Sequence, residues 1–339
     1  MTRPQTESLA VLGAGAWGTA LAVLLARNGI QARLWGHEAP HMERLVRERC
    51  NAQFLPDIDF PESLRACVTL EEALDGVRDI LLAVPCAGFR DTLRVVAETA
   101  SGDIRLAWAS KGMEPGTGKL LHEIVSEVLG RGTPQAVISG PTFAHEVARA
   151  LPTAIAAAAS DGEFAHDLVR YLHNARFRVY TSQDMIGLEV GGAIKNVHAI
   201  AAGIADGLGF GANTRAALVT RGLVEMTRLG VALGARRETF MGLAGLGDLV
   251  LTCTDDQSRN RRLGLALAGG KALREAVDEI GQAVEGIQSA VETMGLARRH
   301  GIAMPITEQV YQVLHEGKPP RQAVDDLLSR HPREETFGA

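Results

Sequence analysis

Residues 9–29, LAVLGAGAWGTALAVLLARNG, decide the fold of the first half of this 339-residue chain. The apolar residues 9–12 predict a short buried strand, which runs directly into the pattern Gly-x-Gly-x-x-Gly over residues 13–18. Residues 19–27 predict a helix that ends at Asn28 and Gly29, a favourable C-terminal cap. A glycine-rich turn between a strand and a helix is more informative than the same glycines in isolation.

Each glycine has its own task in this pattern. Gly13 allows the tight turn, Gly15 lets backbone amides approach a pyrophosphate, and Gly18 lets the helix pack on the strand. The N-terminus of the helix would then face the phosphates. The flanking elements therefore predict a dinucleotide-binding turn, with a merely structural glycine-rich turn as the alternative.

The end of the second expected strand, residues 31–35, bears on the choice of dinucleotide. An NAD-selective site would place an acidic residue there, on the ribose hydroxyls, but the chain has Gly36 and His37. No carboxylate stands at that point to repel a 2′-phosphate, and His37 can donate a hydrogen bond to one. Glu38 follows one position later, which leaves NAD open. The sequence favours NADP, or use of both cofactors.

Strand and helix alternate through the rest of this half. The expected strands are residues 79–84, 105–109, 135–138, 155–159 and 177–180, and the expected helices are residues 70–74, 89–100 and 163–174. Repeated βα units imply an α/β, doubly wound, mostly parallel sheet with ligands at the carboxyl ends of its strands. Lys111 and the loop 140–144 follow such strand ends, so we interpret both as functional, although either could be an ordinary solvated loop.

After Asp184 the strand signals disappear. Helical periodicity is expected over residues 186–208, 214–233, 263–267, 273–280, 289–300, 307–315 and 321–328. We therefore predict a Rossmann-type domain over residues 1–184 and an all-α domain over residues 185–339. No flexible linker separates them, and we expect the ligand cleft between the two halves.

One helix of the second half carries an unusual lysine. Residues 186–208, IGLEVGGAIKNVHAIAAGIADGL, show an apolar row and a second row of tiny residues four apart, interrupted by Lys195. A row of small residues lets another element come close, and a buried ammonium needs a partner, an anionic ligand or a lowered pKa. Lys195 is thus a candidate proton-transfer residue. A lysine that extends its amine to the surface is the alternative, and His198 is a rival base.

Two loops of the second half add polar candidates. The glycine-rich approach at 242–247 leads to Asp248, which could hold a ligand or merely cap the following helix. Ser258 is a plausible N-cap, and Arg259 beside a helix start offers a charged fork and backbone amides to a phosphate. A basic surface turn, Arg259 to Arg262, would have a similar sequence.

Composition excludes several classes of protein. A net charge of −5 gives no reason to expect a nucleic acid or a membrane as partner. The four scattered cysteines suggest thiols in a reducing compartment, and no cluster at metal-ligand spacing appears, so no metal is expected. The polar N-terminus, MTRPQTES, has no signal-peptide core. We therefore expect a cytoplasmic protein.

Seven motifs in register resemble one family. They are the glycine turn with Trp17, SKG at 110–112, SGPTFA at 139–144, GGAIKN at 191–196, GLGD at 245–248, SRN at 258–260 and MPI at 304–306. Together they closely resemble the bacterial NAD(P)-dependent sn-glycerol-3-phosphate dehydrogenases, over about residues 9–328.

The resemblance implies roles for individual residues. It implies that Lys195 is the proton acceptor when the secondary alcohol is oxidised. The implied substrate-binding residues are Lys111, Gly140, Thr142, Lys195, Asp248, Ser258, Arg259 and Asn260. The implied cofactor-binding residues are Gly13, Gly15, Ala16, Trp17, His37, Lys111, Ala144, Arg259 and Glu285. Thr142 stands where serine is usual and keeps the hydroxyl, whereas Ala16 replaces a serine and leaves only backbone amides for the phosphate.

The implied reaction interconverts sn-glycerol 3-phosphate and dihydroxyacetone phosphate with NADP or NAD, NADPH being favoured, and feeds glycerophospholipid synthesis. From its class we expect a homodimer formed through the helical half. A sibling dehydrogenase acting on a 3-hydroxy acid or on ketopantoate is the nearest alternative. A non-catalytic nicotinamide-binding redox sensor is an alternative of a different class.

Overall fold

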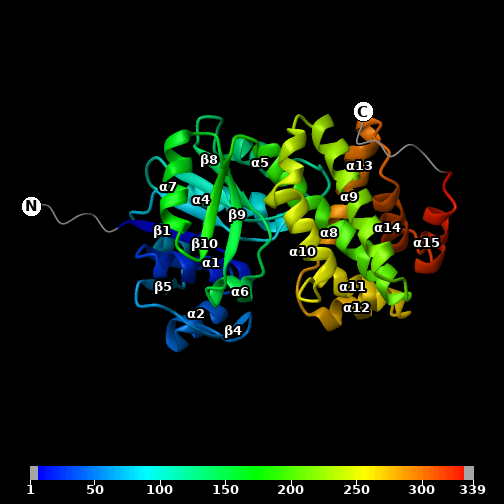
Figure 1. Ribbon diagram of the computed structural model, residues 1–339. Helices are drawn as coiled ribbons and strands as arrows, with labels where there is room; N and C mark the ends of the chain where they lie inside the picture. Colours follow the sequence, from blue (N-terminus) through cyan, green and yellow to red (C-terminus); the bar gives the residue numbers. More distant parts are fainter. Residues whose placement is uncertain (1–6, 332–339) are drawn as a thin grey trace, which may run out of the picture. The chain divides into compact units, whose positions relative to one another are not determined.

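The computed structural model describes residues 7–331, so most of the polar N-terminal stretch and the last eight residues lie outside it. The chain forms two compact units (Figure 1). We call Met1–Ser110 with Leu121–Met185 the sheet unit, and Lys111–Leu120 with Ile186–Ala339 the helical unit. The segment Lys111–Leu120 therefore belongs to the helical unit, although it is inserted in the sequence between two parts of the sheet unit.

The sheet unit is built on eight strands. Their order across the sheet is β10 (Phe177–Ser182), β9 (Thr153–Ala159), β8 (Gln135–Ser139), β7 (Arg105–Trp108), β6 (Asp79–Leu82), β1 (Ser8–Leu12), β2 (Gln31–Trp35) and β5 (Leu64–Cys67). Every neighbouring pair is parallel except β8 and β9, which are antiparallel. This confirms the predicted doubly wound, mostly parallel sheet. The reversal follows from the short connection 140–152, which holds only the helix α6 (Ala144–Ala148), and this helix packs on α1 instead of crossing the sheet.

Helices cover both faces of this sheet (Figure 1). One face packs against α1 (Ala16–Arg27), α2 (Ala39–Glu48), α6 and α7 (Gly162–Leu172), whose buried side chains form one core with alternate strand residues such as Val11 and Leu81. On the opposite face α4 (Phe89–Thr99) places Phe89 edge-on against Trp108, with ring centroids 6.1 Å apart. The helices α3 (Leu70–Leu74) and α5 (Leu121–Val128) pack on α4.

Several features of the sheet unit were not predicted, among them the strand β5 and the helices α5 and α6. The helix α1 begins at Ala16, three residues before the predicted start, because Gly15 acts as its N-cap. The helix α2 and the hairpin of β3 (Cys50–Asn51) and β4 (Leu55–Asp59) lie in a stretch without clear periodicity. Asn51 anchors this hairpin, since its Nδ2 donates to Ala14 O at 2.9 Å and to Thr19 Oγ1 at 2.8 Å.

The described part of the helical unit contains no strand. Its elements are α8 (Met185–Gly207), α9 (Ala212–Ala232), a 3₁₀ turn (Arg237–Met241), a π-helical turn (Leu243–Gly247), α10 (Asp248–Thr254), α11 (Arg259–Ala268), α12 (Leu273–Ile280), α13 (Glu285–His300), α14 (Pro305–His315) and α15 (Pro320–Leu328). Two apolar clusters share α8, which is buried from Gly187 to Ala205. None of the helices within residues 7–331 is long and apolar enough to cross a membrane.

The row of tiny residues on α8 permits the predicted close approach. A Cβ at Gly191 would lie 2.4 Å from Ala244 O, and a Cβ at Gly203 would lie 2.1 Å from Arg261 O. Gly264 of α11 is equally constrained, because its Cβ would meet Ile200 O at 2.2 Å. Backbone thus packs against backbone on this side of α8, and the loop that leads to Asp248 lies directly against the helix that carries Lys195.

Candidate active site

The glycine turn of the sheet unit has the conformation that its sequence predicts. Gly13 has a φ of +122°, and a Cβ there would lie 2.5 Å from Ala83 O. A Cβ at Gly18 would lie 1.9 Å from Gly13 O, so this position needs glycine for the helix to pack against the turn. A Cβ at Gly15 would meet no other atom within 4 Å, and the space beside it suits the predicted approach of a ligand.

The start of α1 fits a dinucleotide. Gly15 caps the helix without a side-chain hydrogen bond, so the backbone amides at Ala16 and Trp17 meet no capping side chain. The Asn51 side-chain amide donates a hydrogen bond to the Ala14 carbonyl and so holds the turn in place. The Trp17 side chain packs on the core with its Nε1 buried and without a hydrogen-bond partner. These features match the chemistry of a pyrophosphate site, in which the protein supplies N–H donors.

The end of β2 presents groups for either dinucleotide. The His37 side chain is 85% exposed, and its Nε2 lies 3.8 Å from Glu38 Oε1. A hydrogen-bond donor for a 2′-phosphate therefore stands next to a carboxylate that could accept from ribose hydroxyls.

The third predicted loop of the sheet unit follows β8. Gly140 has a φ of +151° and approaches Ile155 Cα, which a Cβ would meet at 3.0 Å. Thr142 Oγ1 donates to Gly140 O at 3.1 Å. Ala144 is the first residue of α6 and packs against the core of the sheet unit. The roles of these residues remain predictions.

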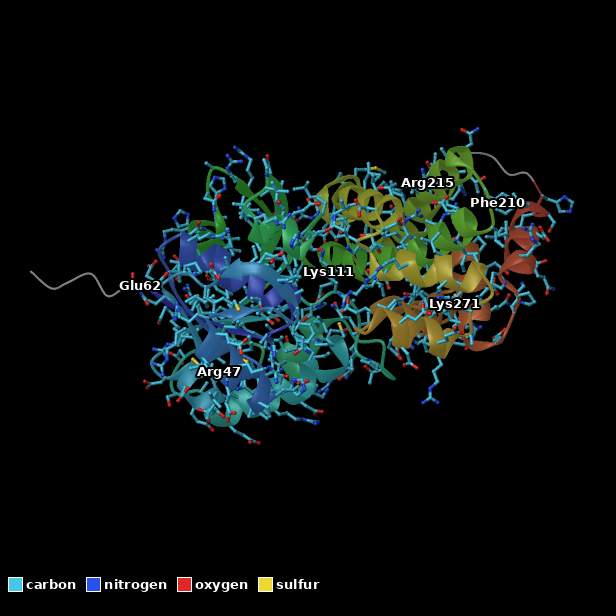
Figure 2. The ribbon with its side chains drawn as sticks, turned by 90° about the horizontal axis from the view of Figure 1, so that it is seen from below. Arg47, Glu62, Lys111, Phe210, Arg215 and Lys271 are labelled. Atoms are coloured by element: carbon cyan, nitrogen blue, oxygen red, sulfur yellow. The ribbon has the colours of Figure 1, made fainter. Side chains whose placement is uncertain are left out.

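The helical unit brings Lys195, Asp248 and Lys111 together. Lys195 is 7% exposed and Asp248 is 1% exposed, so the alternative of a lysine extended to the surface is wrong. Lys195 Nζ donates to Asp248 Oδ1, and Lys111 Nζ donates to Asp248 Oδ2 at 2.7 Å. Lys111 is labelled in Figure 2. Two ammonium groups thus share one carboxylate, which leaves an excess of positive charge for an anionic substrate.

A π-helical turn delivers Asp248 to this cluster. Residues Leu243–Gly247 form the turn, and Asp248 is the first residue of α10, whose N-cap is Gly247. No side chain caps α10, so the alternative that Asp248 merely caps the following helix is wrong. Single π-helical turns are frequent at functional sites.

Burial within this cluster lowers the pKa of Lys195. Burial takes the ammonium out of water and lowers its pKa from 10.5 to about 8, while the Asp248 carboxylate opposes this shift and the Lys111 ammonium adds to it. Desolvation therefore outweighs the attraction of Asp248. The result is an amine that exchanges a proton near neutral pH, as an acid–base catalyst requires.

The remaining predicted residues lie on α11 and α13. Ser258 Oγ accepts from Arg261 N at 3.2 Å, which confirms it as the N-cap of α11, and Arg259 is the first residue of that helix. Asn260 Oδ1 accepts from Gly286 N at 2.9 Å. Burial raises the pKa of Glu285, against the opposing charges of Arg259, Lys195 and Lys111. These electrostatic contacts put Glu285 in the same charged neighbourhood as the lysines.

Sequence reasoning missed two polar residues that contact predicted site residues. Thr252 Oγ1 accepts from Lys195 Nζ at 3.0 Å and donates to Asp248 O at 2.6 Å. Asn196 Oδ1 accepts from Asn260 Nδ2 at 2.9 Å. Asp248 and Thr252 are one helical turn apart. If Asp248 had been taken as the first residue of a helix, this spacing would have predicted that the two side chains lie on the same face.

His198 belongs to a different buried cluster. Its Nε2 lies 3.5 Å from Glu225 Oε2 and 3.4 Å from Thr307 Oγ1. Glu225 also accepts from the backbone amides of Ile306 and Thr307 at the start of α14. These partners give His198 a structural task and favour Lys195 as the base.

Comparisons with known proteins agree with this geometry. The family model for the NAD-dependent glycerol-3-phosphate dehydrogenase N-terminus matches residues 8–165, and the model for the C-terminus of the same enzymes matches residues 184–325. Two curated relatives, both called glycerol-3-phosphate dehydrogenase [NAD(P)+], come from Nitrosococcus oceani and Yersinia pestis. The first is 57% identical over 96% of this chain and 94% of its own, and the second is 55% identical over 98% of each. The crystal structure of glycerol-3-phosphate dehydrogenase from Coxiella burnetii is 50% identical, with a TM-score of 0.94 over 96% of this chain and 100% of that one. This chain belongs to the NAD-dependent glycerol-3-phosphate dehydrogenase family.

Proposed function

We propose that this protein interconverts sn-glycerol 3-phosphate and dihydroxyacetone phosphate by hydride transfer with NADP or NAD. The observation that carries the proposal is the buried pair of Lys195 and Lys111 on the single carboxylate of Asp248. Its positive charge suits a phosphorylated substrate, and its titrating amine suits oxidation of an alcohol. The bound nicotinamide supplies or accepts the hydride.

Lys195 has the central part in the proposed mechanism. As the neutral amine, its Nζ accepts the proton of the C2 hydroxyl while the carbonyl of dihydroxyacetone phosphate forms. In the reductive direction the protonated amine polarises that carbonyl and returns the proton to its oxygen. Asp248 and Thr252 hold Nζ from two sides, which limits the orientations in which the proton moves.

In this proposal, positively charged side chains and backbone amides bind the substrate phosphate. Arg259 opens α11, where a guanidinium fork and the helix start act together on an anion. Lys111 adds an ammonium, and Asn260 adds an amide held by Asn196 and Gly286. Gly140 and Thr142, which belong to the sheet unit, are proposed as substrate-binding residues from the family resemblance alone.

Initial rates test the proposed reaction. The purified protein should oxidise NADPH and NADH with dihydroxyacetone phosphate, and we expect the NADPH rate to be the higher because His37 can donate to a 2′-phosphate. Turnover of 2-ketopantoate or a 3-oxo acid, with none of dihydroxyacetone phosphate, would assign the site to a sibling enzyme. Nucleotide binding with no turnover of any small ketone would indicate a sensor.

We also propose a homodimer formed through the helical unit, and a reducing compartment such as the cytoplasm. The first rests on the class of enzyme and is tested by sedimentation of the purified chain. The second is supported by the four cysteines, none of which forms a disulfide within the described residues.

A further inference from the structure

The segment Lys111–Leu120 leaves the sheet unit after β7 and joins the helical unit. Met113 is 3% exposed and Leu120 is 6% exposed, and both belong to the same apolar cluster as Leu296 and Ala297 of α13. The segment that carries Lys111 therefore packs as part of the helical unit.

Between these two apolar anchors the segment closes into a loop. Glu114 N donates to Lys119 O at 2.9 Å, and Gly118 N donates to Glu114 O at 2.9 Å. Thr117 Oγ1 donates to Glu114 Oε2 at 2.6 Å. Gly116 has a φ of +81° and Gly118 a φ of +69°, values that glycine adopts without strain. The loop has a defined shape, with Gly116 near its tip.

One carboxylate of α13 holds that tip. Glu292 is 6% exposed, and its Oε1 accepts from Gly116 N at 2.8 Å and from Gln288 Nε2 at 2.6 Å. A Cβ at Gly118 would lie 3.3 Å from Glu292 Oε2 and 3.0 Å from Arg299 Nη2, so the loop rests closely on α13. Burying a carboxylate costs free energy unless hydrogen bonds replace those it made with water, so the loss of either contact would be unfavourable.

We propose that Glu292 is a positioning residue that acts through Lys111. By fixing the tip of the loop to α13, it keeps Lys111 Nζ at 2.7 Å from Asp248 and so maintains the two-lysine arrangement around one carboxylate. The inference deepens the proposed function and rests on it, because it assumes that Lys111 and Lys195 act on the substrate.

Two substitutions at Glu292 separate its hydrogen bond from its charge. Glu292→Ala removes the acceptor for Gly116 N, whereas Glu292→Gln keeps an acceptor oxygen at nearly the same place. With Glu292→Ala we expect kcat/KM for dihydroxyacetone phosphate to fall about tenfold, mainly through KM. The acid limb of kcat for glycerol phosphate oxidation should move to higher pH, because the Lys111 ammonium that lowers the pKa of Lys195 is held less firmly. Glu292→Gln should stay within about twofold of the wild type.

A double-mutant cycle tests whether Glu292 acts through Lys111. In a Lys111→Ala background, adding Glu292→Ala should change kcat/KM less than about twofold, because the group that Glu292 positions is already absent. Glu279→Ala is the matched control. It removes an exposed carboxylate of the same unit, which pairs with Lys271, and should leave all these quantities unchanged.

Hydrogen exchange gives a readout that is independent of activity. Glu292→Ala should increase exchange over residues 111–120 and leave α8 and α10 protected, and the thermal midpoint reports whether the variant folds. If the wild-type protein does not turn over dihydroxyacetone phosphate but Glu292→Ala still shows this local loss of protection, the proposed function is wrong and Glu292 still holds the loop. Unchanged exchange and an unchanged pH profile in an active Glu292→Ala enzyme would show that Glu292 does not position Lys111. The same conclusion would follow if Glu292→Ala had an effect of the same size in the Lys111→Ala background.

Discussion

Each unit buries a cluster of charged side chains, and the two clusters differ in their cations. In the sheet unit Arg105 donates to both oxygens of Asp79, at 2.6 and 2.7 Å, and to Asp167 at 2.7 Å, while Tyr171 Oη donates to Asp79 at 2.8 Å. In the helical unit, by contrast, the cations around Asp248 are two lysines. Both clusters are largely hidden from water.

The cations determine what each cluster can do. The hydrogen bonds to Asp79 raise the pKa of Arg105 further above its usual range, so the guanidinium stays charged. Burial instead lowers the pKa of Lys195 to about 8. Arginine keeps its charge and presents a fixed fork of donors, whereas lysine changes its pKa readily when it is buried. The first cluster is suited to hold strands together, and the second is suited to move a proton.

The largest difference between the two clusters should appear in kcat when the lysine at the centre of the helical unit's cluster is removed. Lys195→Ala should lower kcat about a hundred- to ten-thousandfold, the usual range for loss of a general acid–base group. NADPH binding, measured by fluorescence, should persist because the glycine turn lies in the sheet unit. His198→Ala is the comparison variant, and a substantial residual rate in Lys195→Ala together with loss of turnover in His198→Ala would show that the base is misassigned.

In the sheet unit, removal of a charge should affect stability and not chemistry. Asp79→Ala reduces the carboxylate partners of buried Arg105 from two to one, Asp167, and should lower the free energy of unfolding by about 3–5 kcal/mol. Denaturant titration measures this loss, and kcat per folded molecule should be unchanged. The double variant Asp79→Leu/Arg105→Met should recover most of the stability, and a large loss of kcat in it would contradict a purely structural role.

The pH dependence of turnover distinguishes the clusters without a large change in structure. Oxidation needs neutral Lys195, so kcat for glycerol phosphate should rise with pH and reach its midpoint at about 8. In the reductive direction the protonated amine is required, and kcat should fall through the same region. Lys111→Ala removes a nearby positive charge, so it should raise the pKa of Lys195 and move both limbs to higher pH.

The smallest expected effect is the change in stability on substitution of Asp167, at the partly exposed edge of the arginine cluster. Hydrogen bonds from Arg170 and Arg105 outweigh the desolvation of Asp167 and lower its pKa below 3.8. The charged form therefore contributes stability above the unfolded-state pKa, and this contribution is lost as the pH falls through the lowered value. Asp167→Asn should cost about 1 kcal/mol at neutral pH and flatten the acid limb of the stability curve, as thermal melts between pH 2 and 6 would measure.

Much of the fold was predictable because its signals are local. The glycine turn at 13–18 and the periodicity of α8 depend on residues close together in the sequence, and both appear as predicted. The strand β9 was predicted, but its antiparallel direction was not, because that direction depends on where α6 packs. The hairpin that places Asn51 against Ala14 was missed because this contact spans 37 residues.

The candidate site was predictable to a similar extent. Lys195 stood out as a charge in a row of tiny residues, and Asp248 as a carboxylate after glycines. Their pairing, however, spans 53 residues, and Lys111 joins from 137 residues away. The sequence could name these residues individually, but only the packing of α8, α10 and the Lys111–Leu120 segment brings them onto one another.

The packing of the segment Lys111–Leu120 against α13 also affects how the chain folds during synthesis. Met113 and Leu120 leave the exit tunnel long before α13, whose Glu292 lies 176 residues after its partner Gly116. Until α13 is synthesised, these apolar side chains lack their final neighbours in the nascent chain. A ribosome stalled shortly after residue 185 should therefore carry a nascent chain whose loop 111–120 is readily cut by proteases, and protection should arrive only when the segment near residue 300 has emerged.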